Sequence, residues 1–412
     1  MNLEFFIAKR LYSTRKGKRV ISRPAVTIAQ WGVAVGAIIM FLSICIIVGF
    51  KNQVRDKAIG FGGHIQVKSY TNATEGETPI TVDCMLMDGL RNIPGVRHVQ
   101  RFAMKPGMII ANNEYEGIII KGIGAEYDNS FFAAATVEGT WPQYDDSIPS
   151  GKIVISRLTA EKLDIGTGDK IDICFMQGGI RVRRMTIAAI YETHLSEMDN
   201  VIAFTDICTV QRLNEWSNDK ASALEITVND IGDIYNTREY VNEVALSAST
   251  RNMELLHAPT FEELYPALFS WLAVLDQTVW LILVLVLCIA GFTMVSGLLI
   301  LILEKSNLIG ILKAVGARDV SIRKIFIYYA CIIIGKGLVT GNIIAVALCL
   351  LQKELGIVAL DPRMYYMDRV PIEFSWILVP MNVCMFIVSA AMLVAPSMMI
   401  SHIAPAKAIK FE

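Results

Sequence analysis

The hydrophobic positions of the chain fall into four long blocks, separated by segments of mixed polarity. The blocks cover residues 24–50, 277–303, 325–351 and 374–400, and the first contains no charged residue. Each is longer than the ~20 residues that an α-helix needs to cross a bilayer. The pattern therefore predicts an α-helical membrane protein with four transmembrane helices: TM1 at 24–50, TM2 at 271–303, TM3 at 325–351 and TM4 at 374–400.

The region between the first two blocks, residues 51–270, has a different pattern. Short runs typical of strands occur at 64–68, 96–102, 117–123, 152–155, 170–175, 180–191 and 223–228. Runs with helical periodicity separate them at 82–91, 157–163, 206–215 and 235–248. Mixed strands and helices predict a large α+β domain, inserted between TM1 and TM2.

The basic residues orient this arrangement, because cytoplasmic loops carry an excess of Lys and Arg. Residues 1–23 form a basic interfacial segment, and the loop 304–324 has five basic against two acidic side chains. The loop 352–373 has no such excess. We therefore expect the N-terminus, the loop 304–324 and the tail 401–412 in the cytoplasm. The α+β domain and the loop 352–373 should face outward.

Composition changes this picture little. Net charge is −1, so nothing suggests nucleic-acid binding. The five histidines are scattered, and the sequence contains no phosphate-binding loop and no metal-binding or nucleophile motif. We therefore expect no enzyme activity, no metal site and no cofactor in this chain. Cys84, Cys174 and Cys208 lie in the inserted domain, but their spacing assigns no disulfide.

The loop between TM2 and TM3 carries the most specific motif. Residues 304–317 resemble the "E-x-x-x-E-I-G-I-L-R-A-L-G-A" segment of MacB-type ABC permeases, which include the lipoprotein-releasing (LolC/LolE) and FtsX families. The resemblance implies a coupling helix that docks into a separate ATPase, which would bind ATP and Mg. The residues it implicates are Glu304, Lys305, Ile309, Gly310, Leu312, Lys313, Gly316 and Ala317. We expect Ile309 and Leu312 to insert into a groove of that ATPase.

Further motifs resemble the lipoprotein-releasing branch. They lie at 93–96, 156–169, 191–204, 365–371 and 395–410, in the order of that family. The resemblance implies a multi-pass permease subunit of the bacterial inner membrane that passes ATPase motion to a periplasmic domain and extracts lipoproteins. Two alternatives remain open: an FtsX-like transducer that activates a periplasmic cell-wall hydrolase, and a MacB-like exporter of amphiphiles or peptides.

One chain offers few helices for a transport path, so we expect a dimer with a second copy or a paralogue, beside the ATPase. The resemblance also allows a periplasmic carrier. In the family a long loop of the outer domain recruits that carrier, but the corresponding connection here, residues 175–180, is hairpin-sized, with a tight-turn signal at Gly178-Gly179. The sequence does not decide whether a carrier is recruited.

Three further features are candidate sites. Gly49, Phe50, Phe269 and Trp271 should border the outer face between TM1 and TM2, where they either contact acyl chains or belong to the interfacial aromatic belt. Gly337 and Gly341 form a small-xxx-small pattern that favours close helix packing. Lys336 lies in the middle of TM3, where it either contacts an anionic group or extends its amine to the membrane surface.

Overall fold

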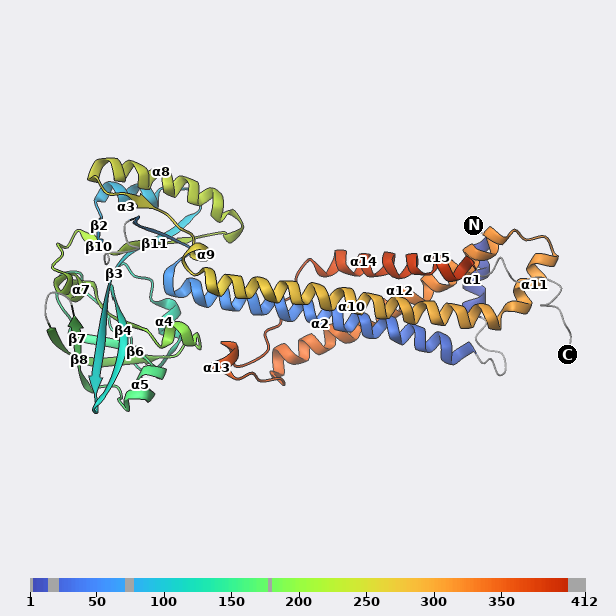
Figure 1. Ribbon diagram of the computed structural model, residues 1–412, viewed down its shortest axis with the longest axis horizontal. Helices are drawn as coiled ribbons and strands as arrows, with labels where there is room; N and C mark the ends of the chain where they lie inside the picture. The colour runs from blue at the N-terminus through green and yellow to red at the C-terminus, as the bar shows by residue number, and fades with distance from the viewer. Residues whose placement is uncertain (1–2, 14–21, 71–77, 177–179, 399–412) are drawn as a thin grey trace. The chain divides into compact units, whose positions relative to one another are not determined.

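The computed structural model describes residues 3–13, 22–70, 78–176 and 180–398. The chain forms two compact units (Figure 1). The helical unit comprises residues 1–52, 271–359 and 369–412, and the mixed unit comprises residues 53–270 and 360–368. Most of the basic stretch 14–23, the centre of the hairpin 175–180 and the tail 401–412 lie outside the described residues.

Long apolar helices build the helical unit. They are α2 (Ser22–Gly62), α10 (Pro266–Glu304) and α12 (Asp319–Leu355), and each is long and apolar enough to cross a membrane. The C-terminal end of α2 and the N-terminal end of α10 continue into the mixed unit. The short helix α1 (Leu3–Ser13) packs on α12, where the rings of Phe5 and Tyr328 meet edge to face.

The block predicted as TM4 forms a shorter helix, α14 (Leu378–Met392), followed by the single turn α15 (Val394–Ser397). The break has a local cause. A proline ring clashes with the carbonyl group four residues before it, and Pro396 stands four residues after Met392, where α14 ends.

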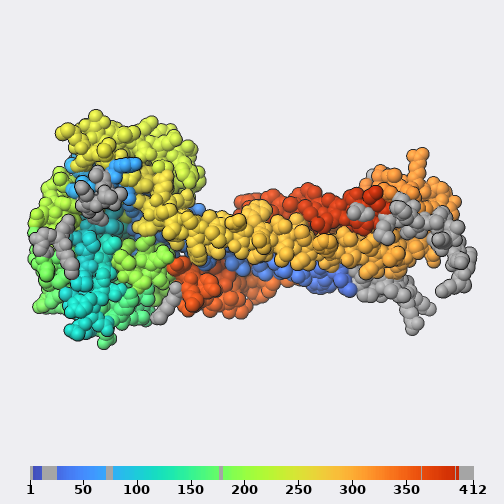
Figure 2. Space-filling model, in the orientation of Figure 1, coloured from blue at the N-terminus to red at the C-terminus, as the bar shows by residue number. Residues whose placement is uncertain are grey.

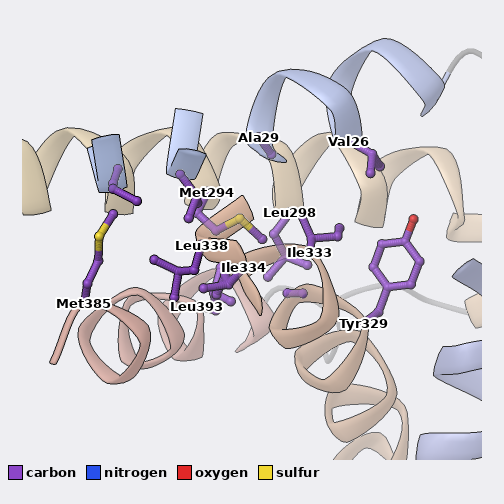
Figure 3. Packing of buried hydrophobic residues seen from close by; sticks show 14 of the residues in the cluster. Val26, Ala29, Met294, Leu298, Tyr329, Ile333, Ile334, Leu338, Met385 and Leu393 are labelled. Atoms are coloured by element: carbon purple, nitrogen blue, oxygen red, sulfur yellow. The ribbon is translucent and has the colours of Figure 1, made fainter. Parts of the chain in front are cut away.

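One apolar core holds the helical unit together (Figure 3). α2 contributes Val26 and Ala29, and α10 contributes Met294 and Leu298. α12 adds residues that include Tyr329, Ile333, Ile334 and Leu338, while Met385 comes from α14 and Leu393 follows it. Figure 2 shows α10 and α14 along one face of this unit. The apolar faces of the helices thus cover one another, as in other helical bundles.

Within the described residues, ten strands of the mixed unit form one sheet with the order β12-β1-β11-β3-β4-β9-β6-β8-β5, and β7 pairs with both β3 and β8. The strands are β1 (Ile65–Ser69), β3 (Val96–Ala111), β4 (Glu114–Ile123), β5 (Thr136–Gly139), β6 (Lys152–Ser156), β7 (Lys170–Met176), β8 (Ile180–Tyr191), β9 (Ile202–Asp206), β11 (Ala223–Val228) and β12 (Leu256–His257). β4 pairs with β9, and β6 with β8, in parallel; the remaining pairs are antiparallel. A separate small ladder joins β2 (Ile80–Thr81) and β10 (Lys220–Ala221).

Among the described residues of the mixed unit, helices cover two of its apolar clusters. α3 (Cys84–Arg91) and α8 (Ile234–Asn252) cover the part of the sheet that contains β1 and β11. α5 (Arg157–Leu163) and α7 (Ile207–Asn214) cover the part that contains β4, β6 and β8. α5 and α7 each begin with a side-chain cap, since Ser156 accepts a hydrogen bond from the Thr159 amide and Asp206 accepts one from the Thr209 amide.

Several predicted elements are confirmed within about two residues, among them β1, β7, β8, α5 and α7. Two strands of the sheet differ most clearly from the prediction. The strand expected at 96–102 continues through Pro106 to Ala111. A proline is tolerated there because one edge of β3 is unpaired at this point: residues 96–102 pair with β11 and residues 108–110 with β7, so Pro106 pairs with β4 alone. The strand β9 was missed, because all five of its residues are buried and show no alternation of polarity.

Candidate functional site

The predicted coupling segment forms a helix between two sharp bends. α10 ends at Glu304, and α11 (Ser306–Ala314) follows at one end of the helical unit (Figure 1). Gly316 then adopts a φ of +91°, a conformation that other residues reach only with strain. The chain turns there and enters α12 at Asp319. This geometry presents one short helix beyond the ends of two long ones.

The apolar side chains that this segment exposes are not the ones that we expected to contact an ATPase. The Ile309 side chain is 0% exposed and belongs to the core of the helical unit, and Leu312 packs partly against the same core. The expected insertion of Ile309 into an ATPase stays a prediction, and it would require this side chain to leave the core of its own chain. The exposed apolar side chains are Ile311 and Val315, at 54% and 83% exposure.

The charged residues of the segment interact within the chain. Lys313 Nζ lies 3.0 Å from Asp319 Oδ1 and is largely shielded from solvent. Lys305 Nζ lies 3.6 Å from Glu304 Oε1. Gly310 is buried, whereas Gly316 is exposed and has open space around the position of a side chain. Ala317 packs partly against the core. These contacts fix the position of α11 relative to the start of α12.

The glycine pair of α12 packs against α2 of the same chain. A side-chain carbon at Gly337 would lie 2.9 Å from the carbonyl oxygen of Gln30, and one at Gly341 would lie 2.6 Å from that of Ala34. Such distances leave no room for a larger residue. The small-xxx-small pattern thus marks a close approach of two helices within one chain.

Near the point where α2 leads toward the mixed unit, polar contacts connect α2 to its neighbours. Lys51 on α2 pairs with Asp276 on α10 at 2.6 Å, and the Asn52 amide donates to Glu373 at 2.6 Å. Phe50 is buried and meets the ring of Trp271 edge to face, with the ring centroids 5.8 Å apart. Among the four predicted rim residues, Trp271 remains substantially exposed at 40%.

The other two rim residues occupy different surroundings. Gly49 is buried, and a side-chain carbon there would lie 3.1 Å from the backbone of Pro371. Phe269 belongs to the mixed unit, where its half-buried ring lies 5.9 Å from that of Phe261. The structure therefore brings Phe50 and Trp271 together and places Gly49 in a packing contact.

Lys336 lies on the exposed side of α12. Its neighbour Gly335 has open space where a side chain would stand, whereas α2 occupies the corresponding space at Gly337. The two acidic residues that border the second apolar block interact elsewhere: Asp276 pairs with Lys51, and Glu304 lies near Lys305.

A groove that the sequence analysis did not identify lies between α2 and α10. Its volume is about 600 Å³, and its lining is almost entirely apolar, with Trp31, Val35, Ile39, Val286 and Ile289 among the residues that form it. Gly32 and Gly36 hold the two helices close together, since a side-chain carbon at Gly32 would lie 2.4 Å from Thr293. The spacing of these two glycines, one helical turn apart, was the feature of the sequence that could have predicted a close contact of α2 with another helix. The groove can accept hydrocarbon or an apolar helix.

The mixed unit contains a buried ion pair that the sequence did not reveal. Lys121 on β4 and Glu225 on β11 are 0% and 1% exposed, and Lys121 Nζ lies 2.6 Å from Glu225 Oε1. The amine also donates to the carbonyl oxygen of Phe61 at 2.6 Å, at the end of α2. Burial lowers the pKa of Lys121, and the neighbouring Glu225 opposes this effect. The pair thus joins the last turn of α2 to the sheet.

Across the described ranges, no three His, Cys, Asp or Glu side chains come together in a way that could hold a metal ion. The three cysteines of the mixed unit are free thiols: Cys84 is exposed, and Cys174 and Cys208 are buried. The polar groups of this unit instead form structural contacts such as the pair above.

Comparison with known proteins gives two family matches. Residues 27–244 match the MacB-like periplasmic core domain, and residues 280–405 match the FtsX-like permease C-terminal region. The chain is 21% identical over 428 residues to the lipoprotein-releasing system transmembrane protein LolE of Haemophilus influenzae, covering 100% of this chain and 98% of that protein. It is 20% identical over 438 residues to LolC of Neisseria meningitidis, covering 100% of both.

Solved structures of similar proteins cover about half of the chain. The extracellular domain of the noncanonical ABC-type transporter YknZ from Gram-positive bacteria has a TM-score of 0.35 and 16% identity, covering 48% of this chain and 98% of that one. The periplasmic region of MacB from Actinobacillus actinomycetemcomitans also has a TM-score of 0.35, with 9% identity, covering 50% of this chain and 91% of that one.

Proposed function

We propose that this chain, which belongs to the family of MacB-like periplasmic core domains and FtsX-like permeases, is the membrane subunit of an ATP-driven complex that releases lipoproteins from the bacterial inner membrane. The observation that carries the proposal is the end-to-end match with lipoprotein-releasing transmembrane proteins. The separation into an apolar helical unit and an α+β unit supports the same function.

In the proposed topology, α2, α10 and α12 are three membrane spans, and α14 with α15 is the fourth. Residues 378–397 would extend roughly 30 Å at 1.5 Å per residue, the thickness of a hydrocarbon core. Both termini and the loop that contains α11 face the cytoplasm, because their basic residues favour the cytoplasmic side of the membrane. The mixed unit and the loop 352–373 face the periplasm.

Coupling to ATP hydrolysis would occur at α11. The exposed side chains of Ile311 and Val315 would dock into a separate ABC ATPase, which binds ATP and Mg, while this chain is not itself an enzyme. Motion of α11 would then pass along α10, whose first residues belong to the mixed unit.

The complex would contain two permease chains, either two copies of this one or this chain and a paralogue. The groove between α2 and α10 supports this assembly, because its apolar lining suits a helix of the second chain. Lys336, exposed on α12, would contact an anionic lipid or substrate group. Lys336→Met should then lower release while expression and assembly stay intact, and unchanged release would exclude that role.

The lipoprotein acyl chains would enter at Trp271, the most exposed of the four rim residues that the sequence indicated. A photo-crosslinking residue at position 271 should trap lipoprotein in membranes that contain the assembled complex. The matched control is Trp376, an aromatic residue near the start of α14 that is 90% exposed and should trap phospholipid alone.

Equal lipoprotein crosslinking at both positions would show that these tryptophans only mark the membrane interface. Purification of the crosslinked complex separates the other candidates. A cell-wall hydrolase would indicate an FtsX-like transducer, and a non-acylated peptide would indicate a MacB-like exporter. A co-purified soluble lipoprotein-binding protein would identify a periplasmic carrier.

A further inference from the structure

The connection between α12 and α14 contains a segment that belongs to the mixed unit. Residues 360–368 group with residues 53–270, although the residues on both sides of them group with the helices. The Leu360 amide donates to the Asp368 carbonyl oxygen at 2.8 Å, which closes the segment into a loop around α13 (Pro362–Tyr365). We call residues 360–368 the loop segment.

Lys57 on α2 holds the loop segment by two short hydrogen bonds. Its Nζ donates to the carbonyl oxygen of Tyr366 at 2.6 Å and to that of Thr193 at 2.7 Å. One amine therefore joins three pieces of chain that are distant in sequence: α2, the turn after β8 and the loop segment. An ammonium group donating to carbonyl oxygens makes a stronger bond than two neutral groups do.

Side chains from the turn after β8 add further contacts. His194 Nε2 lies 3.3 Å from Asp368 Oδ1, and its Nδ1 lies 3.5 Å from Glu192 Oε1. The Tyr366 hydroxyl lies 3.5 Å from Glu197 Oε1. Met367, between the two anchored residues, is buried at 3% exposure.

The turn that faces the loop segment is itself fixed. The Thr193 amide and hydroxyl both donate to the buried Asp199 carboxylate, at 3.1 and 2.7 Å. Thr193 Oγ1 also accepts a hydrogen bond from the Leu195 amide. Its carbonyl oxygen is thus held in place to accept the bond from Lys57.

We propose that Lys57 and His194 fasten the loop segment to the mixed unit, so that α12 and α14 form a second mechanical connection between the coupling helix and the periplasmic unit. This rests on the proposed function. α11 is joined in sequence to α10 on one side and to α12 on the other. α10 runs into the mixed unit directly, and α12 reaches it through the loop segment. Lys57 is a positioning residue in this scheme, because it determines whether α12 and α14 move with the periplasmic unit.

The attachment is tested by hydrogen exchange of the full chain in nanodiscs. Lys57→Met should accelerate exchange of the Leu360 and Met364–Tyr366 amides at least about tenfold, because the bonds that fasten the loop segment are lost. Lys57→Arg should restore protection, because a guanidinium can donate to both carbonyl groups. The matched control is Lys51→Met, which removes an ion pair of 2.6 Å from the same helix within the helical unit and should leave the loop segment protected.

Exchange unchanged by both Lys57→Met and His194→Gln would overturn the attachment. His194→Gln also tests the attachment if Lys57→Met disturbs the folding of α2, because it removes a contact of the loop segment without changing α2. The mechanical role is tested in the assembled complex with its ATPase: both variants should lower lipoprotein release severalfold while ATP hydrolysis stays near the wild-type rate.

Faster exchange with unchanged release would overturn the mechanical role. Failure of the wild-type complex to release any lipoprotein would instead overturn the proposed function and the mechanical role with it. The exchange result would still decide the attachment in that case, so the two failures are distinguishable.

Discussion

The buried pair Lys121–Glu225 gives a prediction whose size follows from the structure. Both side chains are excluded from solvent, and Lys121 also donates to Phe61 at the end of α2. Lys121→Met would leave the Glu225 carboxylate buried without its cation, while the Gln100 side chain still donates to it at 2.9 Å. Removal of one partner from a buried ion pair destabilises a protein by about 3–5 kcal/mol.

The surface supplies a matched control. Lys162 and Glu116 are also 2.6 Å apart, but their side chains are 48% and 24% exposed. Exposed pairs contribute about 0–1 kcal/mol, so Lys162→Met should have little effect. The double variant Lys121→Met/Glu225→Gln should recover part of the lost stability, because no unpaired charge remains and the introduced amide can still bond to Gln100.

The assay is hydrogen exchange of the β4 and β11 amides in the full chain, since these strands carry the pair. A loss of about 3 kcal/mol corresponds to roughly a hundredfold faster exchange through the opened state. Equal exchange rates of these amides in the Lys121→Met and Lys162→Met variants would contradict this prediction. It would mean that the buried pair contributes no more than a surface pair.

Three further predictions concern single residues. Gly341→Leu should disrupt the contact of α12 with α2 and lower the detergent melting temperature by several degrees, whereas Gly335→Leu, where space is open, should not. Burial raises the pKa of Asp199 from 3.8 to about 6, so the folded unit keeps this proton when the unfolded chain has lost it, and stability should fall by about 3 kcal/mol between pH 4 and 6. Asp199→Asn should abolish that fall in denaturant titrations; a persistent fall would assign it to another group. Val315→Asp should leave the fold intact and abolish stimulation of the ATPase, and full stimulation would exclude α11 as the docking helix.

The sequence predicted local elements well where one residue controls them. α5 begins after Ser156, whose hydroxyl caps the helix, and Asp164 at its end adopts a left-handed conformation, so its limits are encoded locally. β9 could not be predicted in this way, because a strand buried on both faces has no alternation of polarity. Its position is fixed by pairing with β4 and β6.

Contacts between elements were harder to predict than the elements. The periodicity of α11 indicated an apolar face, but it did not show that Ile309 packs inward and that Val315 stays exposed. The Gly337 and Gly341 pattern indicated a close helix contact but not its partner, which is α2 of the same chain. The role of Lys57 depends on two carbonyl groups more than a hundred residues away, and the sequence has no local signal for either.

Release of a lipoprotein from a defined membrane tests the proposed function directly. Proteoliposomes would hold this chain, its co-purified permease and ATPase partners and a radiolabelled triacylated lipoprotein, with a soluble lipoprotein acceptor outside. ATP with Mg should move the label to the acceptor, ADP should not, and Val315→Asp should prevent the transfer. Hydrolysis of ATP by an intact complex that leaves all of the label in the vesicles would contradict it.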